Sequence, residues 1–195
     1  MKKSNFLILL FLFGISLSSF GQYNANETAQ NYAIENDNNL SIMISDVLVR
    51  RVSLEYEHVL GDGKMSFNVP LSITLSPYGD LWSDEVHWWL GMGIKFYPTG
   101  QGILRYFIGA EFRLLSVGEE TYYWEGEYPN ESYYSRFENY LNTAFLINNG
   151  LIYSPTGNFF VSANIGFGFL SRSADSTYEQ LVPYATPSFR LGFKF

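Results

Sequence analysis

The chain has 195 residues, a length that suits one domain, and a formal net charge of −7. It contains no cysteine, which excludes a disulfide framework, a thiolate metal site and a lipid-modified N-terminal cysteine. The acidic balance makes nucleic acid and anionic membrane surfaces poor general partners, because both are bound through basic residues. Aromatic residues make up 18% and glycine is frequent, so short strands and tight turns are favoured over helices.

Residues 1–21 have the pattern of a cleaved signal peptide. Lys2 and Lys3 precede an apolar stretch, residues 6–15, which is too short to span a membrane comfortably. The small residues Ser19 and Gly21 place the predicted cleavage before Gln22. Cleavage would leave ten basic against 19 acidic residues, a net charge of −9. The alternative is an uncleaved N-terminal anchor.

The next segment, residues 22–39, is rich in asparagine and nearly devoid of large apolar residues. We predict a polar periplasmic N-terminal arm there. From residue 40 to residue 195, apolar and polar residues alternate with a period of two, the pattern of strands whose two faces meet different surroundings. Eight runs are predicted as strands, near residues 40–45, 52–57, 66–75, 86–96, 105–114, 140–153, 159–169 and 185–195. The Asn148-Asn149-Gly150 stretch suggests a β-bulge within the sixth run.

The connections between these runs alternate in length. Residues 61–63, 98–102 and 154–158 are short turn sequences, whereas residues 46–50, 77–83, 118–134 and 171–182 form the other set, two of them long. Every short turn follows an even-numbered strand, so both ends of the sheet lie on the short-turn side. Short turns on one side and longer loops on the other are typical of barrels that cross the outer membrane.

Aromatic residues cluster at the predicted strand ends, where Tyr and Trp would mark a membrane interface. They are Tyr97, Tyr106, Tyr153, Phe159, Phe193 and Phe195 at one end, and Trp82, Trp88 and Tyr184 toward the other. The sequence thus favours an all-β, eight-stranded, antiparallel up-and-down transmembrane β-barrel. A soluble eight-stranded barrel or sandwich, such as a lipocalin-like carrier, shares the alternation and is the alternative.

The strand count, the turn polarity and the terminal segment Arg190-Leu191-Gly192-Phe193-Lys194-Phe195 resemble the small OmpA/OmpX-type outer-membrane barrels of Gram-negative bacteria. The resemblance covers residues 40–195 and does not include a peptidoglycan-binding domain. It implies an outer-membrane location, contact with outer-membrane lipid, and a C-terminal strand recognised by the barrel-assembly machinery. Phe193 and Phe195 are the residues that would carry this assembly signal.

Charged residues recur on the face opposite the apolar one, and we expect them to point into the barrel. They are Glu55, Glu57, Lys95, Arg105, Glu111, Arg113, Arg190 and Lys194. An eight-stranded barrel is just wide enough for side chains to fill it, so these charges predict a plug of ion pairs. The alternative is a narrow pore or a proton path.

Residues typical of catalysis are sparse. His58 and His87 are the only histidines, and neither has the serine at the spacing that a barrel-embedded deacylase would need. Ser83 and Asp84 precede His87, which leaves a lipid-modifying enzyme as a minor alternative. No cofactor or metal site is predicted.

The connection at residues 118–134 combines five glutamates with Tyr122, Tyr123, Trp124, Tyr128, Tyr133 and Tyr134. Tyr and Trp supply large, rigid contact area, which favours a surface that binds a partner. We also expect the fifth and sixth strands to continue here as a protruding hairpin, with its turn near Pro129-Asn130. The predicted function is non-enzymatic: a structural, adhesive or other surface-interaction role through external loops.

Overall fold

The computed structural model describes residues 37–75, 85–125, 132–172 and 180–195. Its strands are β1 (Asn38–Met43), β2 (Arg51–Leu60), β3 (Met65–Thr74), β4 (Glu85–Phe96), β5 (Leu104–Glu125), β6 (Ser132–Tyr153), β7 (Phe159–Arg172) and β8 (Gln180–Lys194), with one short helix, α3 (Ile44–Val47). The predicted signal peptide and nearly all of the predicted arm lie outside the described residues.

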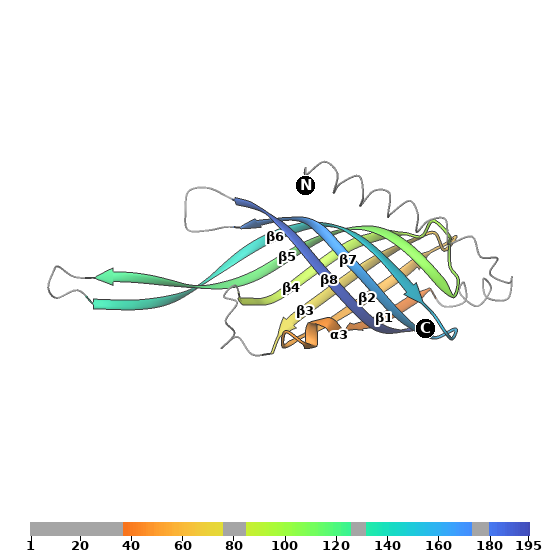
Figure 1. Cartoon of the computed structure of the whole chain (residues 1–195), viewed down its shortest axis with the longest axis horizontal. Helices are drawn as coiled ribbons and strands as arrows, with labels where there is room; N and C mark the ends of the chain where they lie inside the picture. The colour runs from red at the N-terminus through yellow and green to blue at the C-terminus, as the bar shows by residue number, and fades with distance from the viewer. Residues whose placement is uncertain (1–36, 76–84, 126–131, 173–179) are drawn as a thin grey trace, which may run out of the picture.

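The strands form one closed barrel in which each pairs antiparallel with its neighbours in chain order, and β1 pairs with β8 (Figure 1). This confirms the predicted eight-stranded up-and-down fold. Closure is completed by backbone hydrogen bonds between Asn38 and Phe195, 2.9 and 3.2 Å long. The sheet therefore begins at Asn38, two residues before the predicted boundary. None of the helices in the described ranges is long and apolar enough to cross a membrane.

Strands β5 and β6 are much longer than the other six, at 22 residues each. They stay paired from Leu104–Tyr153 to Glu125–Ser132 and run far beyond the rest of the barrel (Figure 1). Strand β4 accompanies β5 only as far as Gly118. The predicted protruding hairpin is therefore present, although its predicted turn at Pro129-Asn130 lies outside the described residues.

The bulge predicted at Asn148-Asn149-Gly150 is wrong, because β5 and β6 keep an unbroken register through these residues. Asn148 points inward and Asn149 accepts a hydrogen bond from the Tyr106 hydroxyl, 2.8 Å away, so both polar residues fit an ordinary strand. The irregularity lies instead in β4, where the register shifts between Val86 and Trp88.

The short turns use glycine where the backbone requires it. Gly63 and Gly100 have φ angles of 72° and 70°, a left-handed conformation that costs other residues energy. Their amides close the turns by donating to the carbonyls of Leu60 and Tyr97, at 2.8 and 3.0 Å. These turns define the short-turn end of the barrel, where β1 begins and β8 ends.

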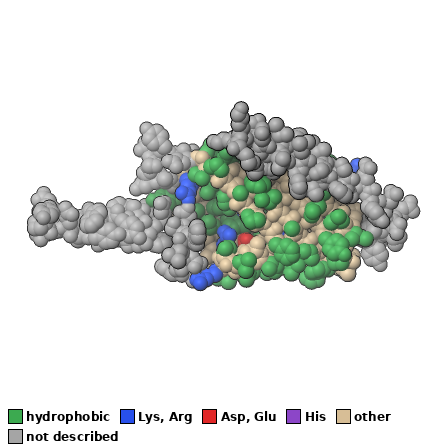
Figure 2. Space-filling model, in the orientation of Figure 1, with side chains coloured by type: hydrophobic (Ala, Val, Ile, Leu, Met, Phe, Trp, Pro, Cys, Tyr) green, Lys and Arg blue, Asp and Glu red, His purple; other side chains and the backbone are tan. Residues whose placement is uncertain are grey.

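The outer face of the sheet is apolar and the inner face is polar, the reverse of a typical soluble protein. Large apolar side chains are exposed on the outer face of every strand, whereas the buried interior holds many polar and charged residues. Figure 2 shows this outer face as a broad apolar surface. The fold therefore brings the charged residues of distant strands together within the lumen.

Candidate functional site

The structure places every charged residue predicted to face inward inside the barrel, with at most 5% of its surface exposed. They come from β2 (Glu55, Glu57), β4 (Lys95), β5 (Arg105, Glu111, Arg113) and β8 (Arg190, Lys194). Strand alternation explains their common direction, since residues two apart on a strand share a face. The charges cluster because barrel closure pairs β8 with β1, which in turn pairs with β2.

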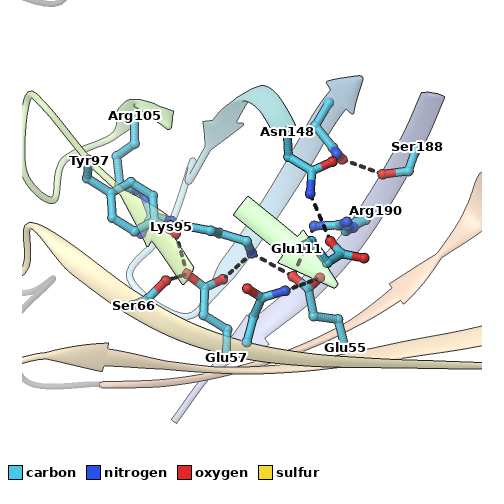
Figure 3. A network of polar contacts seen from close by, with 12 residues as sticks. Glu55, Glu57, Ser66, Lys95, Tyr97, Arg105, Glu111, Asn148, Ser188 and Arg190 are labelled. Carbon is cyan, nitrogen blue, oxygen red and sulfur yellow. Dashed lines mark hydrogen bonds and ion pairs between the residues drawn. The ribbon is translucent and has the colours of Figure 1, made fainter. Parts of the chain in front are cut away.

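Glu55 is the centre of the largest cluster (Figure 3). Its Oε1 atom lies 2.6 Å from Lys95 Nζ and 2.9 Å from Arg190 Nη1. Its Oε2 atom accepts a hydrogen bond of 3.2 Å from the Asn68 side chain. One carboxylate thus compensates two buried cations from strands far apart in the sequence.

Glu57 lies one step nearer the short-turn end and shares Lys95 with Glu55. Its Oε2 atom is 2.8 Å from Lys95 Nζ, and its Oε1 atom accepts a 2.6 Å hydrogen bond from Ser66. The Tyr97 hydroxyl also donates to this carboxylate. Tyr97 lies in the turn after β4, and its burial and the nearby Glu57 charge raise its pKa well above the usual value. Tyr97 thus remains a hydrogen-bond donor.

A second cluster lies on the side toward the long loops. Glu111 and Arg113, two residues apart on β5, form an ion pair, and Asn148 donates to Glu111 at 2.8 Å. The Arg113 guanidinium also lies over the Trp89 ring, 4.1 Å from its centroid, at the distance of a cation–π contact. Arg113 is therefore held from two sides.

The two remaining cations, Arg105 and Lys194, lie toward the short-turn end. Arg105 donates to Ser154 at 3.0 Å and to Gln101, and lies 5.9 Å from the Tyr97 ring centroid. Within the described ranges, neither Arg105 nor Lys194 forms an ion pair. Arg105 is compensated by neutral hydrogen-bond acceptors instead.

An apolar cluster of Tyr97, Phe107, Ile152 and Phe160 closes the lumen near this end. Glycines opposite the rings make room for it: Gly150 pairs with Phe107 and Gly192 with Phe160 across neighbouring strands. A methyl group on Gly192 would overlap the Phe160 ring, and one on Gly150 would stand 2.6 Å from the Phe107 ring. The rings thus pack directly against the glycine backbones.

Three inward residues of the site were not predicted. Tyr97 was expected at the membrane interface, but its side chain is fully buried. It points into the lumen from the end of β4, and its hydroxyl donates a hydrogen bond to Glu57 on β2. Asp46 was assigned to a loop, yet it lies in α3, is buried, and accepts a hydrogen bond from Ser53. Trp89 was not assigned a face, although its neighbour Trp88 points outward. For Asp46, the sequence offered one signal of an inward position, a carboxylate directly after a predicted strand.

The predicted surface residues fall partly outside the described part of the chain. Tyr122, Tyr123 and Trp124 lie on β5, and Tyr133 and Tyr134 on β6, with Tyr123 opposite Tyr134. Tyr128 lies outside the described residues. Phe193 and Phe195, the predicted assembly signal, are outward and about 60% exposed.

Of the residues of the minor enzymatic alternative, His87 lies on β4 at the register shift, and Ser83 and Asp84 lie outside the described residues. In the described ranges no three His, Asp or Glu side chains are grouped so that they could hold a metal ion.

A closed antiparallel barrel with apolar residues outside and charges inside defines the class of outer-membrane-type β-barrels. Among solved structures, the chain is similar to the N-terminal β-barrel domain of OprF from Pseudomonas aeruginosa, with a TM-score of 0.51 and 15% identity. The match covers 82% of this chain and 98% of the OprF domain. No protein-family model matches the sequence, and the comparison with curated proteins finds no match. The fold is thus that of a small OmpA-type barrel.

Proposed function

We propose that this chain is an integral outer-membrane protein whose barrel crosses the bilayer. The observation that carries the proposal is the apolar outer face, which continues around all eight strands. One exposed member per strand is Leu40, Leu54, Phe67, Leu90, Ile108, Ile147, Phe167 and Phe189. A soluble protein rarely exposes a large continuous apolar surface, whereas a barrel in hydrocarbon needs one. Antiparallel closure also satisfies most of the backbone, as lipid requires.

The proposal includes export by the N-terminal segment and assembly from the C-terminal strand. The short-turn end would face the periplasm and the β5–β6 hairpin the outside. Phe193 and Phe195 point outward at the barrel's closing seam, where they are accessible to an assembly partner.

We further propose that the lumen does not conduct ions. The apolar cluster around Phe107 and the Glu55 cluster fill the interior toward the short turns, and the Glu111 cluster continues this filling toward the long loops. Moving a charged side chain away from its partner would leave a buried charge uncompensated. These side chains are therefore expected to stay in the lumen and to block it. Refolded protein in planar bilayers should therefore show no steady conductance.

The role of the protein is proposed to be a surface interaction through the β5–β6 hairpin. Beyond Gly118, β5 continues for seven residues, and within the described ranges only β6 pairs with it there. At about 3.4 Å per residue this is an extension of roughly 24 Å. An extended hairpin has two free edges, and such edges can pair with a strand of a partner. We propose no catalytic role; unchanged lipid A in cells carrying His87→Ala would agree with this, and altered lipid A would contradict it.

Fractionation and refolding test the membrane proposal. The protein should appear in the outer-membrane fraction and migrate differently on gels before and after boiling, as closed barrels do. The barrel should refold in detergent micelles and aggregate in plain buffer. A folded, monodisperse protein in buffer without detergent would contradict the proposal.

Replacing residues 122–135 with an Asn-Gly turn tests the hairpin. The shortened protein should retain the gel shift of a closed barrel, because the described residues of this range, 122–125 and 132–135, pair with one another. Adhesion of cells to surfaces or to other cells should fall relative to cells with the full chain. A variant with only Tyr123 and Trp124 changed to serine serves as control for hairpin length. Unchanged adhesion in the shortened variant would remove the proposed role.

A further inference from the structure

The barrel wall has an opening on the side of the long loops, at the seam between the first and last strands. Strand β1 has six residues and β8 has 15, and their pairing runs only from Asn39–Lys194 to Met43–Arg190. Beyond Met43 the chain leaves the sheet and forms α3. Among the described residues, the part of β8 from Gln180 to Phe189 is therefore paired with β7 alone.

The sequence of β8 is adapted to this open edge. In an antiparallel strand, alternate residues direct both backbone groups to the same side. The backbone of Phe195 is hydrogen-bonded to Asn38 of β1, and the Phe189 amide donates to the Ser45 hydroxyl in α3. The backbone groups of the odd-numbered residues therefore face the seam. Two odd-numbered residues of the open part, Pro183 and Pro187, have no N–H group. Proline in a sheet is confined to edges, and its presence lowers the cost of an unpaired edge in contact with lipid.

A cavity of about 650 Å³ lies behind this edge. Its walls are mostly apolar and include Val86, Leu115, Val117, Leu170 and Val182. Trp89 lies beneath it, packed with Leu115, Val86 and Val117 in one apolar cluster. Figure 2 shows a hollow on this face in which acidic and basic atoms are visible between apolar side chains. The volume falls within the roughly 300–1,000 Å³ of small-molecule sites.

The polar part of the cavity favours an anion. Arg51 lines it, on the same face of β2 as Ser53 and Glu55, and its buried Nε has no hydrogen-bond partner among the described residues. Asp46 also lines the cavity, but its carboxylate already accepts hydrogen bonds from Ser53 and Ser45. Arg172 adds a second cation to the lining.

We infer that this cavity binds a single-chain amphiphile with an anionic head, which reaches it through the opening between β8 and α3. The chain would lie against the apolar wall above Trp89, and the head would accept hydrogen bonds from Arg51. This inference rests on the proposed membrane location. The ligand could come from the bilayer or from the medium, and its chemistry is the same in both cases.

Tryptophan quenching by brominated chains tests the inference in bilayers. The chain has four tryptophans, so changing Trp82, Trp88 and Trp124 to phenylalanine leaves Trp89 as the reporter of the cavity. Changing Trp82, Trp89 and Trp124 leaves Trp88, which points outward. The probes are a brominated long-chain alkanoate, the corresponding brominated alcohol, and brominated phosphatidylcholine.

Brominated phosphatidylcholine should quench Trp88 strongly and Trp89 little. The brominated alkanoate should quench Trp89 saturably, and the alcohol should do so at least about tenfold more weakly, as expected when a charge-assisted hydrogen bond is lost. Arg51→Gln should weaken binding of the alkanoate by a similar factor, whereas Arg50→Gln, on the exposed rim, should not change it. Val182→Trp should fill the cavity and abolish alkanoate binding, whereas Val52→Trp on the outer face should not. Displacement of a radiolabelled alkanoate measures binding to both variants.

The inference would be overturned if the brominated alkanoate did not quench Trp89, or if alkanoate and alcohol quenched it equally. In either case, quenching of Trp88 by brominated phosphatidylcholine would still support the membrane proposal. An unquenched Trp88 would overturn the membrane proposal itself.

Discussion

The two halves of the barrel interior are built differently. Toward the short turns, β1 and β8 close the wall, and ion pairs and aromatic rings fill the lumen. Toward the long loops, one edge of β8 has no strand partner in the described part of the chain, and a largely apolar cavity lies behind it. The comparison shows that one closed sheet can combine a rigid, filled half with a half that has room for a ligand. The length of β1 sets the boundary between them.

The largest effect is expected in the filled half, from Glu55→Gln. This change leaves Lys95 and Arg190 without the carboxylate that they share, and removing one partner of a buried ion pair costs about 3–5 kcal/mol. Urea unfolding in lipid vesicles measures the loss. Lys64→Gln, in an exposed short turn, is the control and should change little. A loss below about 1 kcal/mol for Glu55→Gln would show that the network is not important for stability.

Amide hydrogen exchange along β8 should distinguish the two halves directly. The amide of Ala185 faces the open edge, while those of Tyr184 and Thr186 face β7. Ala185 should exchange at least about 100-fold faster than its two neighbours, a difference of about 2.7 kcal/mol in protection. Leu191 and Phe193, which face β1, should be protected. Uniform protection from Leu181 to Phe193 would contradict the open edge.

A smaller effect is expected from Gly150→Ala. The added methyl group would stand 2.5 Å from Asn164 Cβ and 2.6 Å from the Phe107 ring, and such overpacking costs about 1–3 kcal/mol. Phe107→Leu in the same chain should recover part of the loss, because it removes the ring in contact. Unfolding free energies of the two single variants and the double variant measure this coupling. Strict additivity would show that Phe107 does not pack on Gly150.

The smallest effect on stability is expected from shortening the β5–β6 hairpin at residues 122–135. The described residues of this range, 122–125 and 132–135, pair with one another beyond the β5 residue that pairs with the first residue of β4, so the barrel should lose no more than about 0.5 kcal/mol. Thermal unfolding in detergent, with the full chain in parallel, gives the comparison. A large loss would place the hairpin among the elements that hold the barrel together.

The sequence predicted the parts of the fold that depend on alternation and turns. The inward direction of Glu55 and Arg113 follows from the period of two, and Gly63 and Gly100 lie in tight turns. It did not predict Tyr97 in the lumen, because strand-end aromatics are usual at interfaces and only the paired strands bring Glu57 within reach. Tertiary contacts decided that position.

The seam was also beyond prediction. Pro187 was assigned to a strand, but whether its missing N–H matters depends on how far β1 extends beside β8. The end of β1 is set by α3, in which the Asp46 carboxylate accepts a hydrogen bond from Ser53 on the next strand. The cavity behind the seam therefore arises from a contact between segments that periodicity alone does not relate.

The central claim is that hydrocarbon surrounds the apolar outer face of the barrel. The absence of cysteine allows single spin labels to be placed at Leu54, Phe67, Ile147 and Phe167, with Asp62 in an exposed turn as reference. In bilayers, electron paramagnetic resonance should show that labels at the four outward positions collide more with oxygen than with a water-soluble nickel chelate, and that the label at Asp62 shows the reverse. Greater collision with the nickel chelate at the outward positions would contradict the account.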